Sequence, residues 1–337
     1  MKALTDRIRR LERIEELFTK LRREGCLPYS EFVELVDSVV ADVEFLARTY
    51  GGGYRPRSLT ALLAKLKELA GSYECVPSLE TLLASLRRTI LLALPIPVPP
   101  PIAEELSERL PEILRSTIGF AVEDLASDLG FTLQLLIRDL GAAYGQLADR
   151  IARHGLTEDE LRQVGRDGLG YIAEALAIAF LAVVKGGAWR LAEKRWARVA
   201  GEKITELDLI ARDVEFGVVK LHLAEVKVNP RKLSPEKLVA GKLKPLYEET
   251  RSYEIGRDVC VREVAAITFN EVTEEWEDKF KARVRKAVEE QNMKMCSEGL
   301  NVNIITPSKM IKLAREAGAH SLASAIEVFT KFIQGKK

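Results

Sequence analysis

The stretch ELDLIARDVEFGVVKLHLAEVKVN, residues 206–229, alternates apolar and polar side chains in the way typical of two β-strands joined by a turn. Asp208, Glu225 and Lys227 lie inside these apolar strands. Burying charged side chains is costly unless they are paired with opposite charges or with a ligand. The stretch therefore predicts two adjacent strands with a cluster of charges held between them.

Strand geometry predicts which of these charges meet. Successive side chains alternate between the two faces of a strand, so Glu225 shares a face with Lys227, and Glu206 shares a face with Asp208. A turn near residues 213–217 would bring Asp208 close to Glu225 across the strand pair. Two neighbouring carboxylates repel each other unless a cation or a proton lies between them, and Mg²⁺ or Mn²⁺ prefers such oxygen ligands. Lys227 would then position a water molecule or stabilise charge on a phosphate, whereas the alternative is a cross-strand salt bridge on an exposed edge.

The segments around these two strands predict an α/β domain over residues 157–337. A helix is expected first, with Thr157 and Glu160 at capping-box spacing and a glycine pair at residues 186–187 as its end. Three strands, a helix, a strand, a helix and a short strand should follow. Their expected ranges are 189–199, 203–212, 218–228, 234–254, 261–272 and 274–296, with the last strand beginning near residue 300.

The first half of the chain is predicted to be helical and to be divided by a proline-rich segment. We expect a helical region over residues 1–94, an extended linker over residues 95–102 and a long amphipathic helical segment over residues 103–156. The glycine-rich stretch 50–58 lacks the Gly-Lys-Ser/Thr of a phosphate loop and predicts a connector. Leu4, Leu11 and Phe18 keep a heptad spacing, which indicates either a helix packed in a bundle or a coiled coil that binds a partner.

Composition limits the classes of protein to which the chain can belong. Its 337 residues carry 51 Lys and Arg against 50 Asp and Glu, so a nucleic-acid-binding surface would have to be a local patch. The four cysteines form no CxxC pair, which argues against a zinc or iron–sulfur site and against the disulfide framework of a secreted protein. The longest apolar run, residues 175–184, is too short to span a bilayer. We therefore expect a cytoplasmic protein without a membrane partner, and the many charged residues are typical of hyperthermophiles.

The order of predicted elements and the positions of the charges resemble the PD-(D/E)XK nuclease superfamily, which includes restriction endonucleases and archaeal Holliday-junction resolvases. The shared pattern is a helix with an internal Glu, a strand, a strand bearing Asp, a strand bearing Glu-x-Lys, and then a helix and a strand, over residues 165–306. Archaeal proteins of this superfamily with long helical N-terminal extensions are the most similar. The resemblance implies a restriction-endonuclease-like mixed sheet flanked by helices, after an all-α N-terminal region, and phosphodiester hydrolysis that depends on Mg²⁺ or Mn²⁺.

The resemblance also implies roles for individual residues. Asp208 and Glu225 match the metal-binding acids of the superfamily, and Lys227 matches its catalytic lysine. Glu174 matches a helix glutamate that completes the metal shell, with an ordinary position on the helix surface as the alternative. Glu193 is the second candidate for that role, on condition that its segment is helical.

DNA is the expected substrate, and RNA remains an alternative. A basic stretch that enters the next helix is predicted either to contact a phosphate backbone or to form a solvated face: Arg231, Lys232, Lys237, Lys242 and Lys244. Tyr247, on the same helix, either contacts DNA or packs. His222 lies on the strand face opposite Glu225 and is expected in the core or at a subunit contact rather than as a general base.

Two other functions fit the same sequence. A nuclease fold with weak or absent catalysis would act as a nucleic-acid-binding module, and the helical N-terminal half would suit a scaffold. A homodimer, or a partner protein bound through the N-terminal helices, is compatible with each of these functions. A second Glu-x-Lys, residues 277–279, lies in a predicted helix and is expected to be solvated, so the short motif has meaning only in its strand context.

Overall fold

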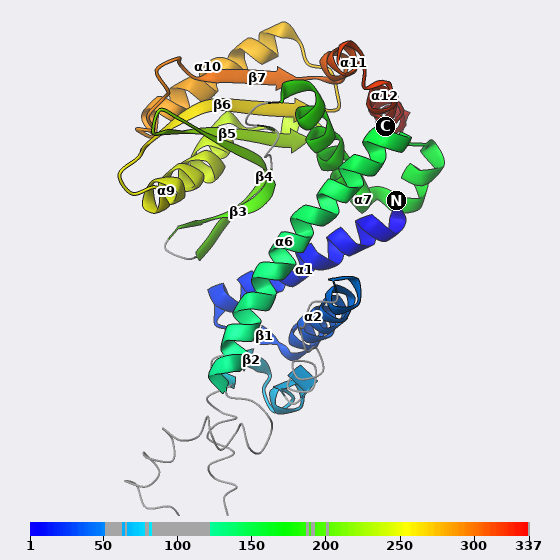
Figure 1. Ribbon diagram of the computed structural model, residues 1–337, viewed down its shortest axis with the longest axis vertical. Helices are drawn as coiled ribbons and strands as arrows, with labels where there is room; N and C mark the ends of the chain where they lie inside the picture. Colours follow the sequence, from blue (N-terminus) through cyan, green and yellow to red (C-terminus); the bar gives the residue numbers. More distant parts are fainter. Residues whose placement is uncertain are drawn as a thin grey trace, which may run out of the picture. The chain divides into compact units, whose positions relative to one another are not determined.

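The computed structural model describes residues 1–50, 63–64, 66–77, 81–82, 122–186, 189, 193–199 and 202–335. These residues form two compact units: unit 1 contains Met1–Ile8 and Gly141–Lys337, and unit 2 contains Arg9–Leu140. The division falls within the helices α1 (Lys2–Glu24) and α6 (Val122–His154), which are labelled in Figure 1. The predicted linker at residues 95–102, both of its boundaries and most of the glycine-rich connector lie outside the described residues.

Unit 2 contains α1 from Arg9 onward and α2 (Tyr29–Tyr50), which ion pairs hold in antiparallel orientation. Arg10 donates to both carboxylate oxygens of the fully buried Asp42, at 2.9 and 3.0 Å. Nearer the other end of α1, Lys20 pairs with Glu31 at 2.7 Å. The buried apolar side chains of α1 in this unit are Leu11, Ile14, Leu17 and Leu21. Of the heptad residues, Leu11 is buried and Leu4 and Phe18 are half-buried, so α1 packs into a core, and partner binding through it stays a prediction.

All four cysteines form disulfide bonds, which corrects the expectation drawn from their spacing. In unit 2 the short strand β1 (Cys26–Pro28) pairs antiparallel with β2 (Cys75–Pro77), so the N-terminal region is not all-α, contrary to expectation, and Cys26 is bonded to Cys75. In unit 1 Cys260 is bonded to Cys296, with their Cα atoms 5.0 Å apart. Missing CxxC motifs exclude local pairs only, whereas the fold brings distant cysteines within bonding distance. The cysteines consequently give no support to the expected cytoplasmic location.

Loss of the Cys260–Cys296 bond is expected to lower the free energy of unfolding by about 3 kcal/mol, because the bond closes a long loop in the unfolded chain. Urea unfolding of the variant Cys260→Ser/Cys296→Ser against the wild type measures the difference. Thiol counting in denatured but unreduced wild-type protein is the control. It should detect no free thiol, and four free thiols would show that neither bond forms.

Unit 1 is an α/β unit built on a five-stranded mixed sheet with the order β3-β4-β5-β6-β7 (Figure 1). The strands are β3 (Glu193–Val199), β4 (Glu202–Glu215), β5 (Val218–Lys227), β6 (Asp258–Thr268) and β7 (Asn301–Ile305). β3, β4 and β5 are antiparallel neighbours, whereas β6 is parallel to β5 and β7 is parallel to β6. The predicted α/β class with a mixed sheet is therefore confirmed, with the strand ends somewhat moved.

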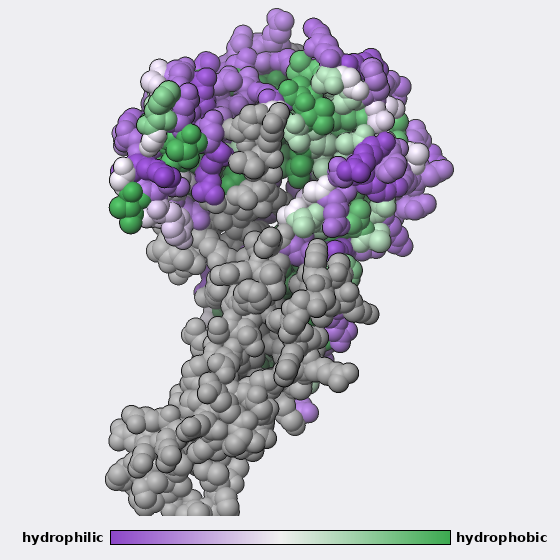
Figure 2. Space-filling model, in the orientation of Figure 1, coloured by the Kyte–Doolittle hydropathy of each residue, from purple (hydrophilic) through white to green (hydrophobic). Residues whose placement is uncertain are grey.

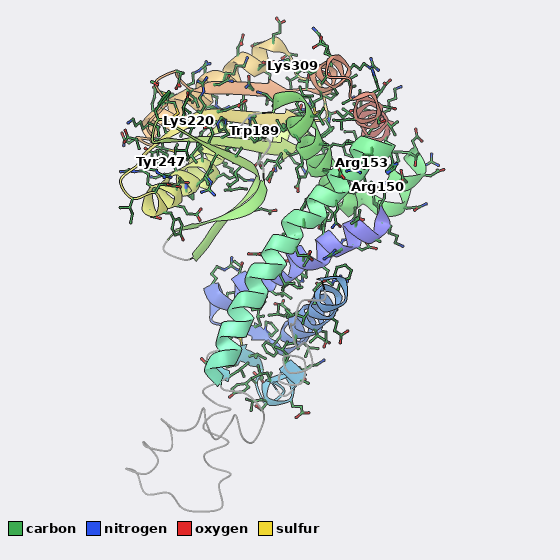
Figure 3. The ribbon with its side chains drawn as sticks, viewed as in Figure 1. Arg150, Arg153, Trp189, Lys220, Tyr247 and Lys309 are labelled. Carbon is green, nitrogen blue, oxygen red and sulfur yellow. A yellow bond between two sulfur atoms is a disulfide. The ribbon has the colours of Figure 1, made fainter. Side chains whose placement is uncertain are left out.

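One face of the sheet packs against the helices that follow β5. The helix expected at residues 234–254 is present as α8 (Pro235–Leu238), a π-helical segment η4 (Val239–Leu243) and α9 (Lys244–Tyr253), and α10 (Glu274–Glu290) lies on the same face. Leu221 and Leu223 of β5 share one apolar core with these helices. Tyr247, labelled in Figure 3, is buried in this core, and its hydroxyl accepts a hydrogen bond from the Lys294 N–H at 3.2 Å. Tyr247 therefore packs.

The other face of the sheet receives the helix expected before the strands. This helix is α7 (Glu158–Phe180), which begins with the predicted capping box of Thr157 and Glu160 and continues into a π-helical segment, η1 (Leu181–Lys185). α7 contacts β5 and α12 (His320–Gly335), and α11 (Pro307–Glu316) precedes α12. The apolar part of this helix is longer than the expected run at residues 175–184. Gly168–Lys185 has the length and composition of a membrane span. Half of this stretch is buried in the fold, as in the core helix of a globular protein.

A two-residue turn, Phe216 and Gly217, joins β4 to β5. Both residues have positive φ, 48° and 79°, as the central residues of a type I′ turn do. The turn fixes the strand register from the pair Glu215–Val218 onward. Phe216 is 98% exposed and is the most exposed large apolar side chain among the described residues. In Figure 2 the hydrophobic residues visible on the surface of unit 1 lie among hydrophilic ones.

Candidate active site

Asp208 and Glu225 lie where β4 and β5 separate. The backbone pairing of these strands ends at Leu209 and Ala224, and the two acids come directly after this last pair. The N–H of Val226 donates to Asp208 Oδ2 at 2.8 Å, so the carboxylate of one strand binds the backbone of the other. The expected approach of Asp208 to Glu225 across the strand pair is present in the structure.

Two lysines bridge these acids and complete a group that we term the charge cluster: Asp208, Glu225, Lys227 and Lys242. Lys227 Nζ lies 3.3 Å from Asp208 Oδ2 and 2.6 Å from Glu225 Oε1. Lys242 Nζ, from η4, lies 3.3 Å from Asp208 Oδ1 and 2.5 Å from Glu225 Oε2. Each carboxylate thus gives one oxygen to each ammonium, and the two positive charges balance the two negative ones.

Burial strengthens the electrostatics of the charge cluster. Asp208 is 4% exposed and Glu225 is 5% exposed. Burial and the negative charge of Asp208 raise the pKa of Glu225, and the two lysines offset only part of this effect. Burial acts to lower the pKa of Lys227, but the charges of Asp208 and Glu225 outweigh it and raise that pKa. Lys227 is therefore a cation at neutral pH.

No family model, curated protein or solved structure matches the chain. The chemistry of the charge cluster is therefore inferred from its own atoms. Mg²⁺ prefers oxygen ligands, and its protein sites use one or two carboxylates together with water and substrate phosphate oxygens. Asp208 Oδ1 and Glu225 Oε2 already share one cation, the Lys242 ammonium, at 3.3 and 2.5 Å, and a Mg²⁺ ion in its place would draw both oxygens to about 2.1 Å from the metal. The donor set fits such an ion.

The third acidic ligand expected from the preceding helix is not part of the cluster. Glu174 lies on α7, and within the described part of the chain no three His, Cys, Asp or Glu side chains are grouped to hold a metal ion. Glu193 begins the strand β3, so the helical segment that its role required is not there. Further ligands would come from water, from the substrate or from the Val226 carbonyl, whose oxygen lies 3.0 Å from Lys227 Nζ.

The structure divides the predicted basic stretch. Arg231 and Lys232, on the 3₁₀ turn η3 (Pro230–Lys232), are exposed, as is Lys237 on α8. These three are accessible to a phosphate backbone. Lys242 belongs to the charge cluster, which its position in the sequence did not reveal, and Lys244 Nζ lies 3.9 Å from Glu248 on its own helix.

In the second Glu-x-Lys, on α10, Lys279 is solvated as predicted, whereas Glu277 is only 16% exposed. Lys279 pairs with Glu275 at 2.5 Å, and the two side chains are 70% and 77% exposed. Glu277 pairs with Lys281 and Lys309. The same short motif therefore gives ion pairs on a helix surface and a buried cluster on a strand, and it provides a matched control for substitutions.

Sequence reasoning missed a second buried polar group, the Glu263 centre, on the opposite face of the sheet. Glu263 on β6 accepts hydrogen bonds from Lys185 Nζ at 2.7 Å, Trp189 Nε1 at 2.8 Å and Asn303 Nδ2 at 2.6 Å. His222 Nδ1 lies 3.4 Å from it, and the ring of His222 packs edge-to-face on Trp189, which Figure 3 labels. Burial acts to raise the pKa of Glu263, but the bonds from His222, Lys185 and Trp189 hold this pKa far below its ordinary value.

The Glu263 centre anchors the end of α7 to the sheet, because Lys185 is the last residue of η1. His222 is buried in this centre, in agreement with the expected core position. The signal that would have found the centre was present in the strand VREVAAIT, where Glu263 is a charge inside an apolar run.

Proposed function

We propose that this chain is a metal-dependent nuclease of the PD-(D/E)XK type that hydrolyses phosphodiester bonds in DNA. The observation that carries the proposal is the meeting of Asp208, Glu225 and Lys227 in one buried cluster where β4 and β5 separate. An ordinary salt bridge at a sheet edge needs no such burial. Buried charged groups whose pKa values are shifted by one another are characteristic of functional sites.

The order of elements in unit 1 supports the same proposal. A helix precedes three antiparallel strands, and a second helix leads to a strand that is parallel to the third. The aspartate lies on the second of the three strands, and the Glu-x-Lys lies at the end of the third. This is the arrangement that the resemblance to the superfamily implies.

Asp208 and Glu225 would hold the metal ion. The Val226 N–H fixes Asp208 Oδ2, which leaves Oδ1 directed toward the position that the two acids share. When bound, Mg²⁺ or Mn²⁺ supplies Lewis acidity, which activates a water and offsets negative charge on the phosphate. The chain contributes by holding both carboxylates in place before the substrate arrives.

Lys227 would act as a fixed positive charge rather than as a base, because its pKa is raised. Its ammonium contacts both acids and the Val226 carbonyl oxygen, so it is held beside the metal position by three partners. From there it would orient the attacking water and stabilise the charge that develops on the phosphoryl oxygens. A donor that is already in place costs little reorganisation during the reaction.

The substrate would reach the charge cluster along the exposed basic residues that follow β5. Arg231, Lys232 and Lys237 would neutralise backbone phosphates, which makes binding dependent on salt and largely independent of sequence. We propose DNA as the substrate, with RNA as the alternative. A homodimer would suit cleavage of two strands.

The purified protein is expected to cleave at least one of four DNA substrates, namely branched, flapped, single-stranded and duplex DNA. Cleavage should require Mg²⁺ or Mn²⁺ and should stop in EDTA. Lys227→Met should lower the cleavage rate constant by about 10²-fold, because a transition-state donor is lost. The matched control is Lys279→Met, which removes the exposed lysine of the second Glu-x-Lys and should cleave like the wild type.

Intact substrates with both metals would refute the nuclease proposal. DNA binding without cleavage, insensitive to Lys227→Met but weakened by Arg231→Ala/Lys232→Ala, would instead support a nucleic-acid-binding module. Metal-dependent cleavage that is unaffected by Lys227→Met would place the active site elsewhere in the chain.

A further inference from the structure

The two lysines of the charge cluster are held very differently. Lys227 follows Glu225 by two residues on the same strand, β5, and its ammonium also donates to the Val226 carbonyl oxygen at 3.0 Å. Lys242 comes from a separate element, η4, and within the described part of the chain its ammonium pairs with the two acids alone. Of the two cations, Lys242 can therefore leave the cluster without disturbing a strand.

Lys242 lies in a segment that is open to solvent, and its own side chain is 20% exposed. Ala240 and Gly241, the two residues before it, are exposed, and a Cβ added at Gly241 would meet nothing within 4 Å. The lysine lies in a π-helical segment, where the Lys244 N–H bonds the Val239 carbonyl instead of following the α-helical pattern. Such segments are rare and occur frequently at functional sites.

We propose that Lys242 is a displaceable internal counter-ion, whose ammonium occupies the place of the metal ion in the metal-free protein and must leave when metal binds. This inference rests on the proposed function, because it assigns the same two acids to the metal. The Lys242 ammonium lies between Asp208 Oδ1 and Glu225 Oε2, whereas the oxygens nearest to Lys227 are Asp208 Oδ2 and Glu225 Oε1. Lys242 is thus a positioning residue that sets the metal concentration the site requires.

Electrostatics explain why such a counter-ion is needed and why it can be replaced. Two buried carboxylates without Lys242 would repel each other with only one positive charge to balance them. A divalent ion brings more charge than one ammonium and can use the same oxygens. Metal binding therefore has to overcome the Lys242 contacts, and removing them should strengthen it.

Direct titration with Mn²⁺ in the absence of nucleic acid tests the proposal. Free Mn²⁺ is measured by electron paramagnetic resonance for the wild type, Lys242→Met and Lys244→Met. We expect Lys242→Met to lower the Kd for Mn²⁺ by about tenfold, since a neighbouring positive charge is removed. Lys244→Met is the matched control, because it removes a charge from the next segment of the same helix outside the cluster and should leave the Kd unchanged. Lys242→Gln, measured in parallel, covers the case in which methionine impairs folding.

A lower Kd for both Lys242 variants, but not for Lys244→Met, supports the counter-ion role. A Kd equal to or higher than that of the wild type overturns it; if the same wild-type preparation cleaves DNA with Mn²⁺, the nuclease proposal stands without it. A lower Kd of similar size in Lys244→Met also overturns it, because general charge loss would then explain the result. If no variant binds Mn²⁺, the counter-ion role fails, and the cleavage assay decides the proposed function separately.

Discussion

Asp208→Asn is expected to reduce metal-dependent DNA cleavage by about 10³-fold or more, since bound metal supplies several kcal/mol of transition-state stabilisation and loses one of two charged ligands. The amide keeps the shape of the side chain and can still accept the Val226 N–H, a bond of 2.8 Å in the structure. The fold should therefore be retained, with a lower stability because Lys227 and Lys242 lose one of their two counter-charges. Cleavage rate constants at saturating Mn²⁺ and the Kd for Mn²⁺ measure the effect, and we expect the Kd to rise.

The control for this variant is Asp278→Asn, which changes the exposed acid inside the second Glu-x-Lys on α10. It should cleave DNA at the wild-type rate. If Asp208→Asn also cleaves at that rate with an unchanged melting temperature, Asp208 is not a metal ligand in the reaction.

Glu263→Gln is expected to lower the free energy of unfolding by about 3–5 kcal/mol at neutral pH, the usual cost of removing one partner of a buried ion pair. Glu263 is 6% exposed and accepts bonds from Lys185, Trp189 and Asn303. A glutamine has one acceptor oxygen, and its NH₂ would face groups that are themselves donors. Lys185 would lose its counter-charge, and the attachment of η1 to the sheet would weaken.

The destabilisation by Glu263→Gln should become smaller in acid. The pKa of Glu263 in the folded protein lies below the unfolded value of about 4.3, so its stabilisation is fully present above that pH and is lost as pH falls toward the folded pKa. Urea unfolding of both proteins at about pH 7 and about pH 3 measures the difference. Glu275→Gln, which removes an exposed partner of Lys279, should change stability little at either pH. Equal effects of the two variants would contradict a structural role for the Glu263 centre.

The strands of unit 1 were predictable because each has an apolar pattern that ends at a turn signal. The Phe216–Gly217 turn and the N-cap residue Thr157 also act locally, and the structure uses them as expected. The π-helical segments η1 and η4 leave no such local signal, since they replace part of an α-helix without a break in its apolar pattern. β1 and β2 are too short for a period of two to be recognised, and a disulfide between them depends on the fold.

The charge cluster was predictable to the extent that its members lie on adjacent strands. Strand parity placed Glu225 with Lys227, and the turn placed Asp208 across from them. Lys242 comes from a helix, and the side of the helix on which it lies depends on the π-helical segment. Lys242 is a member of the cluster that was not predicted, whereas Glu174 was predicted as a member and is not one. Its position in the order of elements matched the superfamily, but the structure does not group it with the two acids. Order along the chain does not determine which face of a helix meets a strand.

The Phe216–Gly217 turn lies at the far end of the hairpin from the charge cluster, yet its length determines which side chains of β4 face those of β5. One residue added to this turn would shift the register and move Asp208 to the other face relative to Glu225. The Val226 N–H would lose its carboxylate partner in the same step. Exposed loops usually tolerate insertions. Among related sequences, differences in length should therefore collect in the other loops of unit 1 and be absent from this turn.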